Sequence, residues 1–330
     1  MKYLTSLTVA AVALATGLAA QAQQPKIGCA VYKFDDTFMS YVRNSILDNA
    51  KGKAQVELVD SQNAQPTQND QVDQFLAKKM NAIAINPVDR TAAAAIIDKA
   101  KAKNLPVVFF NREPLADDMK KYDKVFYVGA KAEQSGLMQG QIAVDYFKKH
   151  PEAYKSHDNV IHYVMLKGEP GHQDAELRTT FSVKAITDAG LKVDKVAEDT
   201  AYWDRPKAVE KMKAWLAKFG DKIDLVLCNN DDMALGAIEA LRQDGYFSGK
   251  KYMPVVGVDA TAPALQALSQ GTLLGTVLND AKNQGKATFD LSFALAEGKP
   301  AASTTWKLTD GKYIWVPYQK VTKENYKQFM

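Results

Sequence analysis

The chain has 330 residues, of which 46% are apolar and 24% are charged. This composition is ordinary for a globular protein and the length suffices for two domains, so wholesale disorder is excluded. The 42 basic residues barely exceed the 38 acidic ones, giving a net charge of +4. Without a concentrated Lys/Arg block, this charge gives no reason to expect a nucleic-acid partner.

The N-terminal segment has the features of a secretory signal peptide. Lys2 supplies a positive start, an apolar stretch follows, and Ala20-Gln21-Ala22 forms a small-x-small cleavage pattern. We therefore predict that residues 1–22 are a signal peptide, cleaved near Ala22, and that the mature chain is exported. No later apolar run reaches the roughly 18 residues that a membrane-spanning helix needs.

After residue 25, short β-rich runs alternate with longer helical segments. The first series contains helices over 38–50, 68–79 and 91–103, and the strands "KIGCAVY", "VELVD", "AIAIN", "PVVFFN" and "VFYVG". The second contains the strands "VIHYVML", "KVAEDT", "IDLVLCNN" and "MPVVGVD", and helices over 132–148, from 175, and over 206–217, 233–243 and 262–270. This alternation predicts parallel sheets joined by right-handed crossovers.

Two such series predict an α/β protein of two similar, doubly wound lobes with a cleft between their strand ends. From "GTVLND" onward the chain adds a helix and two strands, "TTWKL" and "YIWVPY". We expect three hinge strands near Gly129, Asp280 and residues 306–316. The N-terminal lobe would contain residues 23–128 plus 280–305, and the C-terminal lobe residues 129–279 plus 306–330.

The two cysteines lie in apolar strand-like runs of different lobes. Cys29 belongs to "IGCAVY" and Cys228 to "LVLCNN". A disulfide needs Cα atoms close together, and nothing in the sequence indicates such a contact. We predict two buried free thiols that pack as small apolar side chains.

Several predicted strands end in polar residues. In open α/β sheets, ligands bind beyond the carboxyl ends of the strands, so such residues are candidates for a site. Helix capping is the alternative, because Asn and Asp are good N-caps. The recurrence of this pattern in both halves favours a binding site, and the residues concerned are Asp60–Asn63, Asn86, Asn111, Asn229–Asn230 and Asp259.

The segment "LKGEPGHQDAELRTT" places His172, Asp174 and Arg178 where a strand ends and a helix begins. Such a cluster could be catalytic, could bind a polar ligand, or could be a charged helix start. Asp174 and Arg178 are one helical turn apart, so a plain surface salt bridge is a further alternative.

A larger set of candidates can be assembled, most of which lie just after predicted strands. It combines carboxylates and amides with one guanidinium, one imidazole and two aromatic rings, which together complement the hydroxyl groups and C–H faces of a sugar. Three carboxylates against one arginine suit a neutral polyol better than an anion. The candidates are Asp36, Phe38, Asn111, His172, Asp174, Arg178, Trp203, Asn230, Asp259 and Asn279.

These segments, in this order, resemble the galactose/glucose-binding family of periplasmic receptors in bacterial ABC sugar uptake. The resemblance spans the mature chain and is carried by "IGCAVYKFDDTFMS", "DSQNAQPTQNDQVD", "PVVFFNREP", "LKGEPGHQDAELRTT", "DTAYWD", "NNDDMALGAIEAL", "VVGVDA" and "GTVLNDAKNQGKATFDL". It implies the type I periplasmic binding protein fold, with closure about a hinge, and sugar-binding roles for all ten candidates. Phe38 and Trp203 would then cover opposite faces of the sugar ring.

The resemblance also implies partners and a location. The ligand would be a hexose, D-galactose or D-glucose, delivered in the periplasm to the membrane permease of an ABC importer. The protein would be a monomer without a catalytic role. Which of the two hexoses is preferred, and whether a chemoreceptor also binds the protein, stay open at this point.

Members of this family have a calcium-binding loop, and the residues at its ligand positions differ in this chain. In "YKSHDNVIH", residues 154–162, Tyr154 and Ser156 occupy the first ligand positions and only Asp158 supplies a carboxylate, while the distant ligand position holds Asp224 instead of Glu. Calcium takes six to eight oxygen ligands, which this loop does not offer. We therefore expect that the calcium site is lost and that the protein has no cofactor.

Two other functions fit parts of the sequence. A hydrolase could use Asp36 or Asp259 with His172, because carboxylates beside a sugar also occur in glycosidases. However, the chain has no nucleophile elbow, P-loop or G-x-G-x-x-G motif. A sugar-responsive repressor shares this fold, but the export signal argues against it.

Overall fold

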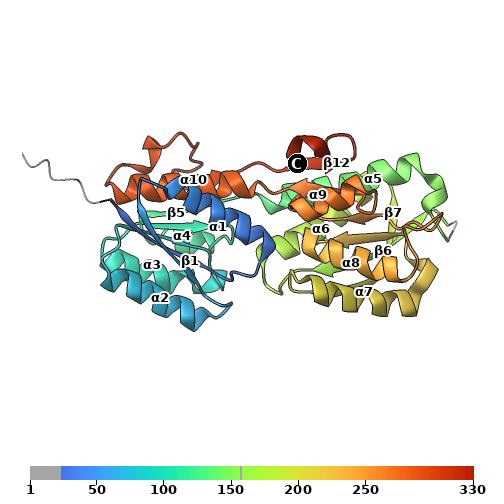
Figure 1. Cartoon of the computed structure of the whole chain (residues 1–330), viewed down its shortest axis with the longest axis horizontal. Helices are drawn as coiled ribbons and strands as arrows, with labels where there is room; N and C mark the ends of the chain where they lie inside the picture. The colour runs from blue at the N-terminus through green and yellow to red at the C-terminus, as the bar shows by residue number, and fades with distance from the viewer. Residues whose placement is uncertain (1–23, 157) are drawn as a thin grey trace, which may run out of the picture.

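The computed structural model describes residues 24–156 and 158–330, which form two lobes of similar construction lying side by side (Figure 1). The predicted signal peptide, residues 1–22, lies outside the described residues. Each lobe contains one six-stranded sheet with helices packed against it. The predicted α/β class with two doubly wound lobes is therefore confirmed.

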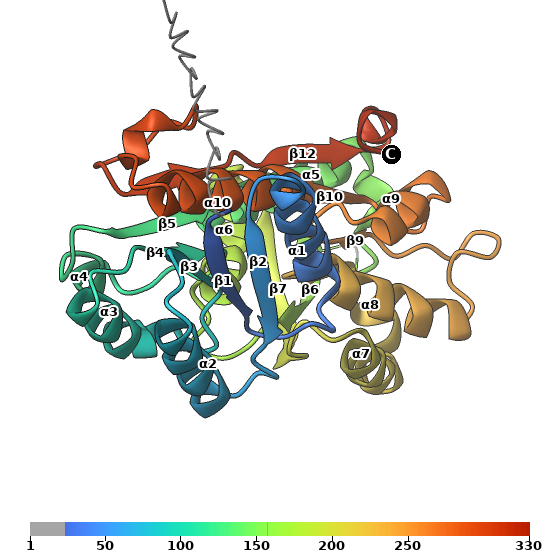
Figure 2. The ribbon, with the colours of Figure 1, turned by 60° about the vertical axis from the view of Figure 1, so that its left-hand side comes forward.

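The first sheet has the strand order β11-β5-β4-β3-β1-β2, and every neighbouring pair is parallel. Its strands are β1 (Lys26–Val31), β2 (Gln55–Asp60), β3 (Ala82–Ile85), β4 (Val107–Phe110), β5 (Val125–Gly129) and β11 (Tyr313–Trp315). The helices of this lobe are α1 (Thr37–Ala50), α2 (Gln65–Ala77), α3 (Ala93–Ala102), α4 (Ala116–Met119) and α10 (Ala281–Ala296). Figure 2 shows α10 beside α1, on the face opposite α2 and α3.

Both faces of the first sheet are buried, which explains its nearly continuous apolar strands. Along β4, Val108 and Phe110 pack into one core cluster, whereas Val107 and Phe109 pack into the other. Successive strand residues point to opposite faces, so a strand covered on both sides needs apolar residues at every position.

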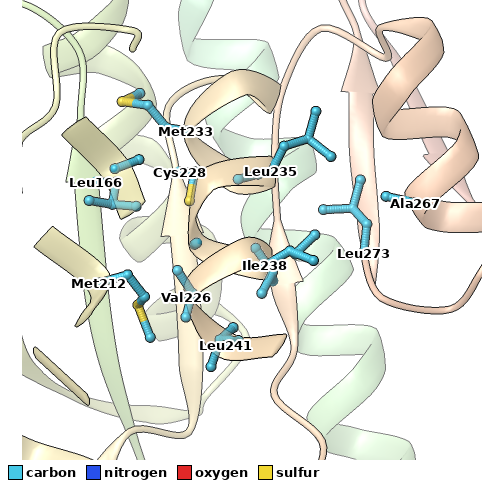
Figure 3. Close-up of a cluster of buried hydrophobic side chains, with 14 of the residues drawn as sticks. Leu166, Met212, Val226, Cys228, Met233, Leu235, Ile238, Leu241, Ala267 and Leu273 are labelled. Carbon is cyan, nitrogen blue, oxygen red and sulfur yellow. The ribbon is translucent and has the colours of Figure 1, made fainter. Parts of the chain in front are cut away.

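The second sheet has the order β12-β10-β9-β8-β6-β7 and is parallel except for the β10–β12 pair. Its strands are β6 (Val160–Lys167), β7 (Lys192–Thr200), β8 (Leu225–Cys228), β9 (Val255–Val256), β10 (Gly275–Leu278) and β12 (Gln319–Thr322). Its helices are α5 (Ala132–Lys149), α6 (Gln173–Asp188), α7 (Arg205–Phe219), α8 (Asp231–Gln243) and α9 (Ala262–Ser269). Figure 3 shows its larger core, where Val226 and Cys228 of β8 lie against Ile238 and Leu241 of α8.

The chain passes between the two lobes three times. It leaves the first sheet after β5, returns to the first lobe between β10 and α10, and crosses again between β11 and β12. The expectation that residues 306–330 belong to the C-terminal lobe is therefore wrong for their first half. β11 pairs with β5 in the first sheet, and only the segment from β12 onward joins the second.

One predicted strand is absent. The segment "TTWKL", residues 304–308, follows the short 3-10 helix Ala301–Ser303 and makes no strand. Its alternating apolar residues, Trp306 and Leu308, instead pack on the core of the first lobe, and the indole Nε1 of Trp306 donates to Asp290 Oδ2 at 2.9 Å. The alternation reflects partial burial against α10.

The predictions about the two cysteines and about membrane-spanning helices can be compared with the described residues. Cys29 in β1 and Cys228 in β8 are fully buried free thiols in different sheets, as expected. Of the helices in the described part of the chain, none combines the length and the apolar character that a membrane span requires.

Candidate functional site

A cleft between the lobes gathers residues that follow strands of both sheets. The empty space among its lining residues, counting space that is open to solvent, is ≈ 350 Å³. All ten residues proposed from the sequence line this cavity, together with three others. The lining residues are Tyr32, Asp36, Phe38, Met39, Asn111, Arg112, His172, Asp174, Arg178, Trp203, Asn230, Asp259 and Asn279.

The first lobe presents Asp36 from the turn between β1 and α1, and Phe38 from the first turn of α1. Asp36 caps α1, because its Oδ1 accepts from the backbone N of Met39 at 2.7 Å, and its Oδ2 accepts from the hydroxyl of Tyr32 at 2.5 Å. The carboxylate is thus fixed by its own lobe. Each carboxylate oxygen has further acceptor capacity for a ligand hydroxyl.

Asn111 and Arg112 follow β4 on the same side of the cleft. The Oδ1 of Asn111 accepts from Asn86 Nδ2 at 3.2 Å, which leaves its amide NH₂ free of protein partners among the described residues. Arg112 is only 5% exposed, and its guanidinium lies over the ring of Tyr32 at 3.6 Å from the centroid. The first lobe therefore offers an amide donor and a buried cation.

The second lobe presents His172, Asp174 and Arg178 from the start of α6. His172 caps the helix, since its Nδ1 accepts from the backbone N of Asp174 at 3.1 Å. In that arrangement the other ring nitrogen, Nε2, carries the proton and can donate. Burial, with Arg112 and Arg178 nearby, lowers the pKa of His172 well below its usual value, so the ring is neutral.

Arg178 is the most extensively bonded residue of the cavity. Its guanidinium donates to the backbone O of Asn229 at 2.9 Å, to the hydroxyl of Tyr318 at 3.1 Å and to Asp174 Oδ2 at 3.2 Å. Burial raises the pKa of Asp174, and Arg178 opposes that rise. The pair is 4% and 14% exposed, so it is not the exposed helix-surface salt bridge that the spacing alone allowed.

Trp203 follows β7 and packs directly on the backbone of Gly168. Its ring meets His172 edge to face, with centroids 5.0 Å apart. The buried indole Nε1–H has no hydrogen-bond partner among the described residues. Because buried donors are normally paired, the indole keeps a donor available to a ligand.

Asn230, Asp259 and Asn279 form the remaining wall of the second lobe. Asn230 caps α8, accepting from Met233 N at 3.0 Å. Asn279 Nδ2 donates to Asp259 Oδ1 at 3.2 Å, and Gln284 donates in turn to Asn279. Burial raises the pKa of Asp259 well above its usual value, although Arg178 acts in the opposite direction.

Several of these residues hold unusual backbone angles. Asn111, Trp203 and Asp259 have φ angles of 61°, 63° and 127°. Side chains other than glycine rarely adopt positive φ, and such conformations cluster at functional sites, where the surrounding structure maintains them. Their concentration at one cavity supports its assignment as the candidate site.

Sequence reasoning missed Tyr32, Met39 and Arg112. The signal for Arg112 was present, because it directly follows Asn111 at the end of β4, and it changes the charge balance to three carboxylates against two guanidinium groups. Conversely, Asn86 does not line the cavity. Its side chain accepts from Tyr32 N at 3.2 Å and donates to Phe110 O at 3.1 Å, so it holds neighbouring strand ends together.

The loop that resembles a calcium site has a different arrangement. Asp224 is fully buried; its Oδ1 accepts from Lys155 N at 3.0 Å and its Oδ2 from His162 N at 2.9 Å. The ammonium of Lys155 lies 2.6 Å from the backbone O of Ile223. Protein donors and a cationic side chain thus occupy the region, and these residues do not fit a calcium ion. Within residues 24–156 and 158–330, no three His, Cys, Asp or Glu side chains cluster as a metal site would require.

A two-lobed α/β fold with an interlobe cavity of hydrogen-bonding groups defines a class of solute-binding proteins. Residues 27–300 match the family described as periplasmic binding protein domain, and the chain belongs to this family. The family expected from the sequence is thereby confirmed.

Among its relatives, the chain is 44% identical to the D-galactose/methyl-galactoside binding periplasmic protein MglB of Haemophilus influenzae, over 97% of this chain and 96% of that protein. It is 32% identical to a putative rhizopine-binding protein of Rhizobium meliloti, over 96% of each. A solved ABC transporter solute-binding protein of Bacillus halodurans with bound myo-inositol matches with a TM-score of 0.79 and 29% identity, covering 94% of this chain and 98% of that one.

Proposed function

We propose that this protein is a periplasmic receptor that closes around a hexose, D-galactose or D-glucose, and delivers it to the permease of an ABC importer. The similarity to the galactose-binding relative over nearly the whole chain supports the sugar class. Family membership supports the role of receptor. We also propose that the protein acts as a monomer and that its closed form is recognised by a chemoreceptor as well as by the permease.

The observation that carries this proposal is the composition of the cavity wall. Phe38 in one lobe and Trp203 in the other line the same small cavity as three carboxylates and three amides. Aromatic rings suit the C–H faces of a pyranose, whereas carboxylates and amides suit its hydroxyl groups. Arg112 and Arg178 are paired with the carboxylates of Glu169 and Asp174, so neither guanidinium needs an anionic ligand as its counter-ion, and a neutral polyol is favoured.

The number of polar groups is sufficient for tight binding. A hydrogen bond to a charged group contributes roughly 1.5–3 kcal/mol net. Micromolar affinity needs about 8 kcal/mol, which several such bonds in a water-excluding cleft supply. Asp36, Asp174 and Arg178 are each held in place by hydrogen bonds to the protein. Little side-chain conformational entropy is therefore lost when the ligand binds.

Closure follows from the division of the wall between lobes. Asp36, Phe38 and Asn111 belong to the first lobe, whereas Trp203 and Asp259 belong to the second. A ligand therefore gains contacts in the closed form that the open form lacks, and that difference shifts the population toward closure. The three interlobe crossings are the proposed hinge.

The competing hydrolase hypothesis requires a group that moves a proton. Asp36 already accepts from Tyr32 and Met39, and His172 Nδ1 is engaged by its own helix. Incubation with an aryl galactoside distinguishes the two functions. A receptor releases no aglycone, whereas release that Asp36→Asn abolishes would favour the enzyme.

Calorimetric titration with a panel of monosaccharides and polyols tests the proposed function. We expect one site per chain and micromolar or tighter affinity for D-galactose, D-glucose or both. Ribose, xylitol and myo-inositol should bind at least tenfold more weakly. Absence of hexose binding, or tighter binding of a polyol or pentose, would contradict the proposal.

A further inference from the structure

One edge of the cleft carries an ion pair between the lobes. Arg112 follows β4 in the first lobe, and Glu169 follows β6 in the second. Arg112 Nη2 lies 2.9 Å from Glu169 Oε2, and the two side chains are 5% and 18% exposed. This cross-cleft pair is therefore largely shielded from water and depends on the lobes being together.

The first lobe holds Arg112 by contacts of its own. Its Nη1 donates to the backbone O of Val88 at 2.8 Å, and its guanidinium stacks on Tyr32. The planar guanidinium suits both contacts, which orient it before any partner arrives. Little side-chain entropy is then lost when Glu169 approaches.

A second contact supports the same edge. Gln173 Nε2, in the second lobe, donates to Glu113 Oε2, in the first, at 3.1 Å. Glu113 is anchored within its own lobe, because its backbone O accepts from Arg90 Nε at 2.7 Å. Arg112 and Glu113, which follow β4, thus contact Glu169 and Gln173, which lie before and at the start of α6.

The two members of the cross-cleft pair differ in their relation to the cavity. Arg112 lines the candidate sugar cavity, whereas Glu169 does not. We propose that Arg112 is a positioning residue that couples ligand contact to lobe closure, through an ion pair with Glu169 that forms only in the closed form. This proposal rests on the proposed function and extends it to the control of ligand release.

The ion pair between Arg112 and Glu169 mainly affects the rate at which the ligand is released. When the lobes open, the separated charges of Arg112 and Glu169 are hydrated again. The net free energy gained on closure is therefore smaller than the direct electrostatic attraction between them. Breaking a shielded pair nevertheless precedes departure of the ligand. Removing one member of such a pair typically changes the dissociation rate more than the association rate.

Stopped-flow fluorescence with D-galactose tests this coupling on the full mature chain. Glu169→Gln keeps the shape of the side chain and removes its charge. We expect the release rate to rise about tenfold and the association rate to stay within about twofold. Glu169→Asp keeps the charge and should restore part of the slow release.

Glu176→Gln is the matched control, since Glu176 pairs with Lys167 at 2.9 Å inside the second lobe. Its release rate should equal that of the wild type. An unchanged release rate in Glu169→Gln, or an equal rise in Glu176→Gln, would overturn the proposed coupling and leave the hexose receptor intact. Failure of the wild type to bind any hexose would overturn both proposals.

Discussion

A Cβ atom on Gly168 would lie 2.1 Å from the indole ring of Trp203. Relieving so short a contact requires the indole ring, or the backbone at the end of β6, to shift. The position of the aromatic wall therefore depends on a glycine that does not itself line the cavity.

We expect Gly168→Ala to displace the indole and to weaken hexose binding at least tenfold. Calorimetry measures this loss, and a thermal melt shows whether the variant stays folded, because Trp203 also packs against the larger core of the second lobe. An Ala variant with wild-type affinity would show that the ring does not cover the ligand.

Asp36→Ala and Trp203→Ala should each weaken binding of galactose or glucose by at least an order of magnitude. The first removes an acceptor already oriented by Tyr32, and the second removes the apolar wall of the second lobe. The matched controls are Asp35→Ala and Tyr202→Ala, exposed neighbours outside the cavity. Calorimetry should give near-wild-type affinity for both controls, and unchanged affinity in the two site variants would place the ligand elsewhere.

Asp231→Asn should change how stability depends on pH. Asp231, the first residue of α8, is fully buried, and its carboxylate accepts from Thr276 Oγ1 at 2.7 Å and from Thr261 N at 2.8 Å. Burial raises its pKa to about 7. Because the folded value exceeds the unfolded one, its contribution is full at low pH and is lost as pH rises to about 7.

Urea unfolding at pH 5 and pH 8 measures this difference. Relative to the Asn variant, the wild type should lose stability between the two values, by up to about 1.4 kcal/mol for each pH unit titrated. His172, whose pKa is lowered, acts in the opposite direction in both proteins and cancels in the comparison. Because the charge of Asp231 also raises the pKa of the buried Asp259, the difference reports on both carboxyl groups, and identical pH profiles would contradict the raised pKa of Asp231.

Calcium should have no effect on this protein. The oxygens of Asp224 are engaged by Lys155 and His162, so an incoming ion would have to displace protein donors without gaining enough ligands. A calcium titration should show no tight stoichiometric binding, and a chelator should leave the melting temperature unchanged. Tight binding at one ion per chain would disprove this expectation.

Most of the ten candidate residues could be located from the sequence because they lie just after strands, which are local features, and the family resemblance supplied their sugar-binding roles. Asp36, Asn230 and Asp259 each follow an apolar run, and parallel strands necessarily bring such positions to one edge of a sheet. Asn86 occupies an equivalent position but is used to join strand ends. Whether a residue after a strand lines the cavity or bonds to a neighbouring strand depends on which strands lie side by side. The local sequence does not show this.

The C-terminal segment was harder to predict for a different reason. "TTWKL" alternates like a strand, yet Trp306 bonds to Asp290 on a helix. β11 has three residues, and nothing in them indicates which sheet has a free edge beside it. Only the assembled fold shows that the edge next to β5 is the one available.

The placement of β11 and β12 has a consequence for the exposed edges of the two sheets. β11 lies at one edge of the first sheet and β12 at one edge of the second, so residues 313–322 cover a strand edge in each lobe. Without these two short strands, the backbone N–H and C=O groups of β5 and β10 would face solvent as open edges. Such edges can pair with strands of other molecules, so this segment also protects both lobes against edge-to-edge aggregation.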